Sequence, residues 1–279
     1  MDLKLQQALD NLPPLREIIS QHQLSAQKAL GQNFLLDQNI TDKIVREAGD
    51  FEGCTIFEIG PGPGGLTRSL LKSAAKKVVA IEFDPRAVEA LQNLVNVSNG
   101  KLTVMHGDAL TAVLHEMGES PRGIVANLPY NIATPLLINW LKDISKNPQA
   151  YRFMALMFQK EVTERICAMP STKAYGRLSV IAQWLCDVSV IYELPASAFT
   201  PPPKVKSAVV RFSPKENIIL KPEFHDVERV TELAFGQRRK MIRSSLKFYM
   251  PIIEKLEIDP TIRAENLTVD EFLSIASDI

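Results

Sequence analysis

The sequence predicts an α/β fold in which a doubly wound, mostly parallel sheet of seven strands is followed by a small C-terminal all-helical domain. Two observations lead to this prediction. Short runs rich in β-branched residues alternate with helix-like segments, and such alternation is typical of parallel sheets covered by helices. After Pro214 the strand signals fade and helical patterns take over. We therefore expect two domains, 1–213 and 214–279.

The elements are expected in the following order. Buried parallel strands are predicted where short apolar runs end in turn residues, at 55–59, 78–83, 102–105, 123–126 and 153–158. Two later runs are close enough in sequence to form an antiparallel pair, at 188–193 and 207–212. Helices are predicted at 64–75, 85–97 and 134–143, and beyond the boundary at 227–235, 240–249 and 269–277.

The 279 residues have a globular composition, with 46% hydrophobic and 23% charged residues. No apolar run approaches the length of about 18 residues that spans a membrane, and a signal-peptide pattern is missing, so we expect a soluble, cytoplasmic monomer. The cysteines and histidines are scattered, which predicts neither a disulfide nor a metal site. Lys+Arg equals Asp+Glu at 32 each, so any basic surface must be local.

A glycine-rich segment, Glu58 to Thr67, follows the first predicted parallel strand and opens a helix. Glycines let a ligand approach the backbone closely, and the free amides at a helix N-terminus attract negative groups. Glu82 stands at the end of the next strand, where a carboxylate can hold ribose hydroxyls. The segment therefore predicts an adenosine-containing cofactor, bound in part by Gly60, Gly62 and Glu82.

The glycine spacing alone leaves the cofactor open, because Gly60, Gly62 and Gly65 also satisfy the dinucleotide pattern G-x-G-x-x-G. A nicotinamide-dependent dehydrogenase is therefore an alternative, and a tight turn without a ligand is a weaker one. Two acids favour a methyl donor: Glu58 before the glycines, and Asp108 after the third strand, which can accept from an adenine amine. Taken alone, Asp108 could instead cap a helix.

The segment Asn127-Leu128-Pro129-Tyr130 follows the strand at 123–126, where a doubly wound sheet presents reacting groups. An exocyclic adenine amine is a weak nucleophile, because its lone pair is delocalised into the ring. The Asn127 side-chain oxygen and the Leu128 carbonyl, held outward by Pro129, can accept both amine protons and aim the lone pair at a methyl donor. The segment predicts amine methylation without a strong base, and an ordinary strand-to-loop turn is the alternative.

Two aromatic residues are candidates for stacking on an extruded base. Tyr130 ends the proposed catalytic segment, and Phe199 precedes a run of three prolines. Stacking of a base on an aromatic ring is worth roughly 1–3 kcal/mol. For Phe199, a place in the hydrophobic core is the equal alternative.

With these segments, the sequence resembles the ribosomal RNA adenine dimethylases over nearly its whole length. The resemblance rests on 30–35, 58–67, 127–132, 159–162, 175–180 and 199–205. It implies a Rossmann-like class I methyltransferase with S-adenosylmethionine as cofactor. It further implies donor binding by Asn33, Leu35, Gly60, Glu82, Asp108 and Asn127.

The resemblance also implies the substrate, which composition and spacing do not reveal. Bacterial small-subunit members dimethylate, at N6, two adjacent adenosines in a hairpin near the 3′ end of small-subunit rRNA, within an immature 30S-type subunit. Two other readings stay open. One is a related dimethylase of large-subunit rRNA, and the other is an assembly or transcription factor that keeps the fold mainly to bind nucleic acid.

A basic segment, 236–249, is expected to form a helix that contacts RNA. It contains no acid, and Ile242 with Leu246 gives it an inner face. The candidate RNA-binding residues are Arg238, Arg239, Lys240, Arg243 and Lys247. A solvated charged face is the alternative. A wider basic rim is possible at Lys160, Arg165, Lys173, Arg177, Lys204 and Lys206, where surface solubility and strand-edge protection are the alternatives.

Overall fold

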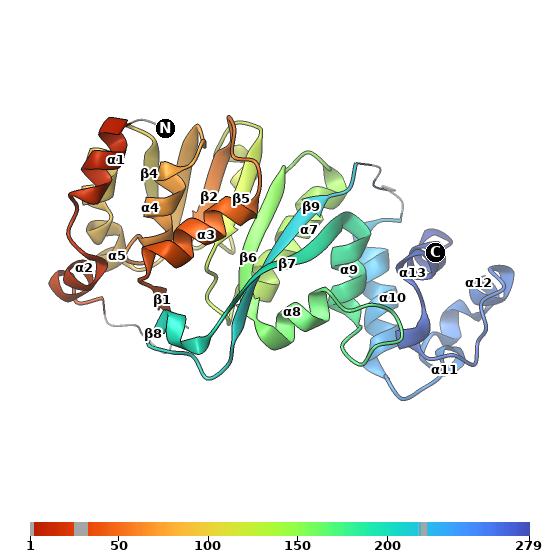
Figure 1. The fold of residues 1–279 in the computed structure, drawn as a ribbon. Helices are drawn as coiled ribbons and strands as arrows, with labels where there is room; N and C mark the ends of the chain where they lie inside the picture. Colours follow the sequence, from red (N-terminus) through yellow and green to blue (C-terminus); the bar gives the residue numbers. More distant parts are fainter. Residues whose placement is uncertain (1–2, 25–32, 217, 219–221) are drawn as a thin grey trace. The chain divides into compact units, whose positions relative to one another are not determined.

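The computed structural model describes residues 3–24, 33–216, 218 and 222–279 (Figure 1). The chain divides into two compact units. The first comprises Met1–Asn139, Gln149–Lys160 and Val190–Phe212, and the second comprises Trp140–Pro148, Glu161–Ser189 and Ser213–Ile279. The expected single boundary near residue 214 stays a prediction: the last segment of the second unit begins at Ser213, but that unit also takes in two earlier segments.

Seven strands form one mostly parallel sheet in the order β4-β3-β2-β5-β6-β9-β7, which confirms the predicted fold class. Pairs β3–β4, β2–β3, β2–β5 and β5–β6 are parallel, and β6–β9 is antiparallel. A two-stranded antiparallel pair, β1 with β8, was not expected from the sequence. The strands are β1 (Phe34–Leu35), β2 (Thr55–Ile59), β3 (Lys77–Glu82), β4 (Leu102–His106), β5 (Arg122–Ala126), β6 (Phe153–Gln159), β7 (Cys186–Leu194), β8 (Phe199–Thr200) and β9 (Ser207–Pro214).

The helices agree with the predicted alternation, and further ones lie in regions where none was predicted. The predicted helix at 85–97 is divided at Leu91 into α5 and α6. In chain order the helices are α1 (Leu3–Asp10), α2 (Leu15–Gln21), α3 (Gln38–Ala48), α4 (Gly65–Lys72), α5 (Pro85–Ala90), α6 (Gln92–Val97), α7 (Ala133–Lys146), α8 (Lys160–Ile166), α9 (Arg177–Leu185), α10 (Phe224–Gly236), α11 (Ile242–Ser245), α12 (Met250–Lys255) and α13 (Val269–Ser277).

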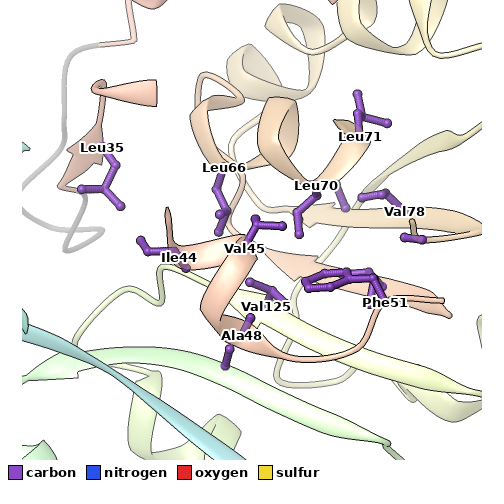
Figure 2. Close-up of a cluster of buried hydrophobic side chains, with 14 of the residues drawn as sticks. Leu35, Ile44, Val45, Ala48, Phe51, Leu66, Leu70, Leu71, Val78 and Val125 are labelled. Atoms are coloured by element: carbon purple, nitrogen blue, oxygen red, sulfur yellow. The ribbon is translucent and has the colours of Figure 1, made fainter. Parts of the chain in front are cut away.

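The core of the first unit fixes the glycine-rich segment in place. Figure 2 shows Ile44, Val45 and Ala48 of α3 in one cluster with Leu66 and Leu70 of α4. All are buried, and each large aliphatic side chain contributes about 1.5–3 kcal/mol by leaving water. Because α4 is anchored on this side, the turn that precedes it is held against the end of β2.

In the second unit, the predicted helix at 240–249 is wrong. The chain there forms only the four-residue α11 and a separate 3₁₀ turn, Lys247–Tyr249. The start of this stretch is held from outside, because the Ile242 N–H donates to the Ile262 carbonyl at 2.8 Å. The predicted inner face is confirmed, since Ile242 and Leu246 are fully buried.

Candidate donor site and catalytic loop

A cavity of about 240 Å³ in the first unit, the donor cavity, collects the segments that follow four neighbouring strands, β4, β3, β2 and β5. Parallel strands end at the same edge of a sheet, so segments far apart in sequence meet there. The structure brings together every predicted cofactor residue in its lining: Asn33, Leu35, Gly60, Gly62, Glu82, Asp108 and Asn127. Leu128, Pro129 and Tyr130 also line it.

Two glycines let the first strand-to-helix turn close over the cavity. Gly62 has φ +55°, and a Cβ there would lie 2.9 Å from the Phe34 ring. At Gly65, a Cβ would lie 2.4 Å from the Leu35 carbonyl oxygen. Side chains at these positions would therefore push away the β1 segment, which lines the same cavity.

Glu82 is held rigidly by three backbone amides. Its Oε1 accepts from the N–H groups of Phe83 and Asp84, at 2.8 and 2.9 Å, and its Oε2 accepts from Gly62 N–H at 3.0 Å. Burial raises the pKa of this carboxyl, and the three amides oppose that rise. The carboxylate thus ties the end of β3 to the glycine turn, with its orientation set in advance.

Glu58 lines the cavity as a buried acid with one unpartnered oxygen. It is 1% exposed, and its Oε2 has no hydrogen-bond partner in the described part of the chain. Burial raises the pKa of Glu58 to about 8, and the nearby charge of Glu82 adds to the rise. A buried oxygen without a partner is costly, so this position favours a ligand that brings a hydrogen-bond donor or a positive charge.

The outer part of the cavity is more apolar than the sequence indicated. Phe83 and Leu110 are 61% and 36% exposed, and both line the cavity. Asp108, between them in sequence, accepts from the Leu110 N–H at 2.9 Å and so caps a turn as well as lining the cavity. Phe83 was missed, although its place directly after Glu82 at a strand end was the available signal.

Asn127 begins the loop Asn127–Tyr130, the candidate catalytic loop, with its amide orientation already set. Its Nδ2 donates to the Asn33 backbone carbonyl at 2.9 Å, which leaves Oδ1 as the acceptor of a side chain that lines the cavity. Leu128 is buried, and the Pro129 carbonyl accepts from Ile132 and Ala133 as α7 begins. The loop is therefore held at both ends.

The two aromatic candidates differ in their surroundings. Tyr130 lines the cavity, and its hydroxyl lies 2.7 Å from the Ser207 Oγ. Phe199 is 2% exposed within the hydrophobic cluster and is not among the residues lining the cavity. As the chain is folded here, Phe199 is a core residue, and its place beside a base stays a prediction.

In the second unit, the predicted RNA-binding residues divide into two kinds. Arg238 is engaged within the unit, because it donates to the carbonyls of Lys173 and Tyr175 at 2.7 and 3.1 Å. The other four cations are exposed, as Arg238 itself is: Arg239, Lys240, Arg243 and Lys247. Sequence reasoning passed over Phe248, which is 76% exposed and has the Lys247 Nζ 4.8 Å from its ring centroid.

The wider basic rim includes cations with local partners. Arg165 pairs with Glu161 at 2.5 Å, and Arg177 pairs with Glu228 at 3.0 Å.

Within the described residues, no group of three or more His, Cys, Asp or Glu side chains is arranged to hold a metal ion. None of the described helices has the length and apolar run that a membrane span requires.

Comparison with known proteins agrees with this geometry. The sequence model of a family described as "Ribosomal RNA adenine dimethylase" matches residues 23–279. The ribosomal RNA small subunit methyltransferase A of Rhodospirillum rubrum is 50% identical over 270 residues, which cover 96% of this chain and 92% of that protein. The protein of the same name from Ruegeria sp. is 49% identical over 276 residues and covers 98% of both chains.

Solved structures extend the likeness to three dimensions. A dimethyladenosine transferase from Plasmodium falciparum matches with a TM-score of 0.74 at 28% identity, over 86% of this chain and 94% of its own. The 23S rRNA methyltransferase ErmE matches with a TM-score of 0.66, over 88% of this chain and 100% of its own. At 23% identity, ErmE shows the shared fold alone.

Proposed function

Because the chain belongs to the ribosomal RNA adenine dimethylase family, we propose that it dimethylates, at N6, two adjacent adenosines in a hairpin near the 3′ end of small-subunit rRNA. It is an S-adenosylmethionine-dependent rRNA methyltransferase. Its substrate particle is an immature 30S-type subunit in the cytoplasm, on which it acts as a monomer. The substrate follows from the family, and the observation that carries the methylation of an amine is the hydrogen bond from Asn127 Nδ2 to the Asn33 carbonyl.

The residues of the donor cavity fit S-adenosylmethionine, which supplies an electrophilic methyl group on a positively charged sulfonium. The unpartnered Glu58 oxygen suits a positively charged ligand that carries hydrogen-bond donors. Glu82, fixed by three amides, suits a pair of ribose hydroxyls, and the exposed Phe83 ring suits an adenine face. Asn33, Leu35, Gly60, Gly62, Asp108 and Asn127 complete the proposed donor site.

The catalytic loop activates an amine by orientation. Since Asn127 Nδ2 is committed to the Asn33 carbonyl, Oδ1 is the atom that accepts a hydrogen bond from the amine of the target adenine. The Leu128 carbonyl accepts a hydrogen bond from the second N–H of the amine, so the nitrogen lone pair is directed away from both acceptors. Tyr130 supplies a stacking face for the extruded base. Phe199 would complete the stack only by leaving its packed position.

The basic segment supplies contacts to RNA outside the donor cavity. Arg239, Lys240, Arg243 and Lys247 are exposed, and binding them to phosphates would release counterions. Phe248 adds an exposed ring beside Lys247, on which an unpaired base can stack. Arg238 contributes less, because its guanidinium already donates to two backbone carbonyls.

The test is to map the product. Immature small subunits and, in a parallel reaction, large-subunit rRNA are incubated with the protein and isotopically labelled donor, and the rRNA is digested and analysed by mass spectrometry. We expect N6,N6-dimethyladenosine at two adjacent positions near the 3′ end of small-subunit rRNA. Label only in large-subunit rRNA would mean that the substrate is large-subunit rRNA. The absence of label, together with the absence of donor binding in a titration, would favour an assembly factor without catalysis.

A further inference from the structure

Tyr130 and Ser207 join the catalytic loop to a strand that is not its neighbour. Their hydroxyl oxygens are 2.7 Å apart, although Tyr130 follows β5, Ser207 begins β9, and β6 lies between those strands in the sheet. We propose that Ser207 is a positioning residue, which holds the Tyr130 ring at the angle that the target base requires. This inference rests on the proposed function, in which Tyr130 stacks on an extruded adenine.

Ser207 is a firm anchor. It is 1% exposed, and its Cα is paired with Gln159 in the antiparallel ladder between β6 and β9. The carbonyl of the preceding Lys206 accepts from Lys160 N–H at 2.9 Å, so the backbone next to the Ser207–Gln159 pair is hydrogen bonded as well. A hydroxyl on such a backbone has little freedom to follow a moving partner.

Tyr130 lies in a loop, and its hydroxyl is bonded to Ser207. It is partly exposed and lines the donor cavity. The bond to Ser207 fixes the far end of the side chain, while the backbone fixes the near end. A ring held at both ends presents a preformed face, so that less side-chain freedom is lost when a base stacks on it.

A role for the Tyr130 hydroxyl as a base does not fit the same observations. Burial raises the pKa of this phenol, so the neutral form persists well above neutral pH. A neutral hydroxyl that is bonded to Ser207 is suited to hold a position. The side chain therefore acts through its ring, and Ser207 acts through Tyr130.

The experiment is a double-mutant cycle on the full chain with Ser207→Ala and Tyr130→Phe. Each single change removes one hydroxyl and keeps the aromatic ring at position 130. We expect each to lower the single-turnover rate of methyl transfer about three- to tenfold, as for the loss of one net hydrogen bond, and the double variant to be no slower than either. Donor affinity should not change, and Ser207→Thr should restore most of the rate.

The control is Ser98→Ala, because Ser98 is equally buried and hydrogen bonded but lies away from the cavity lining. It should leave the single-turnover rate unchanged. Additive losses in the cycle, or equal losses in Ser98→Ala and Ser207→Ala, would overturn the inference while leaving the proposed function intact. If the wild-type protein methylates no adenosine, the proposed function fails instead. In that case the free energy of unfolding is measured for the four proteins of the same cycle. A coupling energy of zero between the Ser207 and Tyr130 changes would overturn the inference.

Discussion

The donor cavity of the first unit and the basic segment of the second unit hold their proposed ligands in opposite ways. In the donor cavity, Glu82 and Asn127 are bonded to backbone groups before any ligand arrives. On the basic segment, Arg239 and Lys247 stand exposed. A preorganised site fails when one member is lost, whereas exposed cations contribute small, separate and salt-sensitive amounts. Mutations should therefore act sharply in the donor cavity and gradually on the basic segment.

The largest effect is expected at Asn127. Asn127→Ala removes the oriented acceptor, so the single-turnover rate of methyl transfer should fall by about 10³-fold, as when one preorganised polar group is removed from an active site. Donor affinity, measured by titration calorimetry, should fall much less. Asn93→Ala, on the exposed side of α6, is the matched control and should keep the wild-type rate. A rate within a few fold of wild type in Asn127→Ala would remove the distinction between the two regions.

The next effect tests how tightly the donor cavity is closed. In Gly65→Ala the new methyl group would meet the Leu35 carbonyl at 2.4 Å, so the β1 segment must move. We expect a loss of about 3 kcal/mol in the free energy of unfolding, typical of overpacking against fixed backbone, together with weaker donor binding. Denaturant titration measures the first quantity. Gly236→Ala, which meets nothing within 4 Å, should cost little.

A third effect follows from the raised pKa of Glu58. The folded state holds this proton up to about pH 8, whereas an unfolded glutamate releases it near pH 4.5, so the folded protein binds more protons between these values. Stability must therefore fall as pH rises through that window, by about 2 kcal/mol between pH 6 and 8 from this group. In Glu58→Gln that share of the pH dependence should disappear from denaturant titrations.

The control for this prediction is Glu52→Gln, because Glu52 is exposed. That variant should keep the pH dependence of the wild type. Identical pH profiles for the wild type and Glu58→Gln would contradict the prediction, because they would mean that burial does not hold the Glu58 carboxyl in its neutral form.

The smallest effects are expected on the basic segment, where two neighbouring side chains should behave differently. Lys247→Ala should weaken RNA binding about fivefold and lower the slope of log affinity against log salt by about one, because one phosphate contact is lost. Phe248→Ala should weaken binding by a similar factor without changing the slope, since stacking releases no counterions. Filter binding over a range of salt concentrations measures both.

Lys255→Ala is the matched control in the same unit, because Lys255 is paired with Asp278 at 2.7 Å. It should change neither the affinity nor the slope. If Phe248→Ala alters the slope as Lys247→Ala does, the ring is a support for the lysine and not a platform for a base.

Local patterns were sufficient for much of the fold and of the donor site. The apolar runs of β2, β3, β5 and β6 are short, bounded by turns and buried, so their strand character follows from composition. The segment at 240–249 was misjudged, because helical periodicity says nothing of the hydrogen bond from Ile242 to Ile262. A local sequence pattern cannot predict that a backbone N–H will bond to a carbonyl in a distant segment.

The amino-acid order alone was enough to predict which segments line the donor cavity: a glycine turn before a helix, an acid at the next strand end, and an amide-bearing loop after β5. These depend on spacing within single segments, which the parallel sheet then carries to one edge. Tertiary structure decided the rest. It placed Phe199 in the core, left Phe83 and Phe248 exposed, turned Asn127 by its bond to Asn33, and set Ser207 against Tyr130. Each outcome depends on contacts between segments far apart in sequence, which no local periodicity encodes.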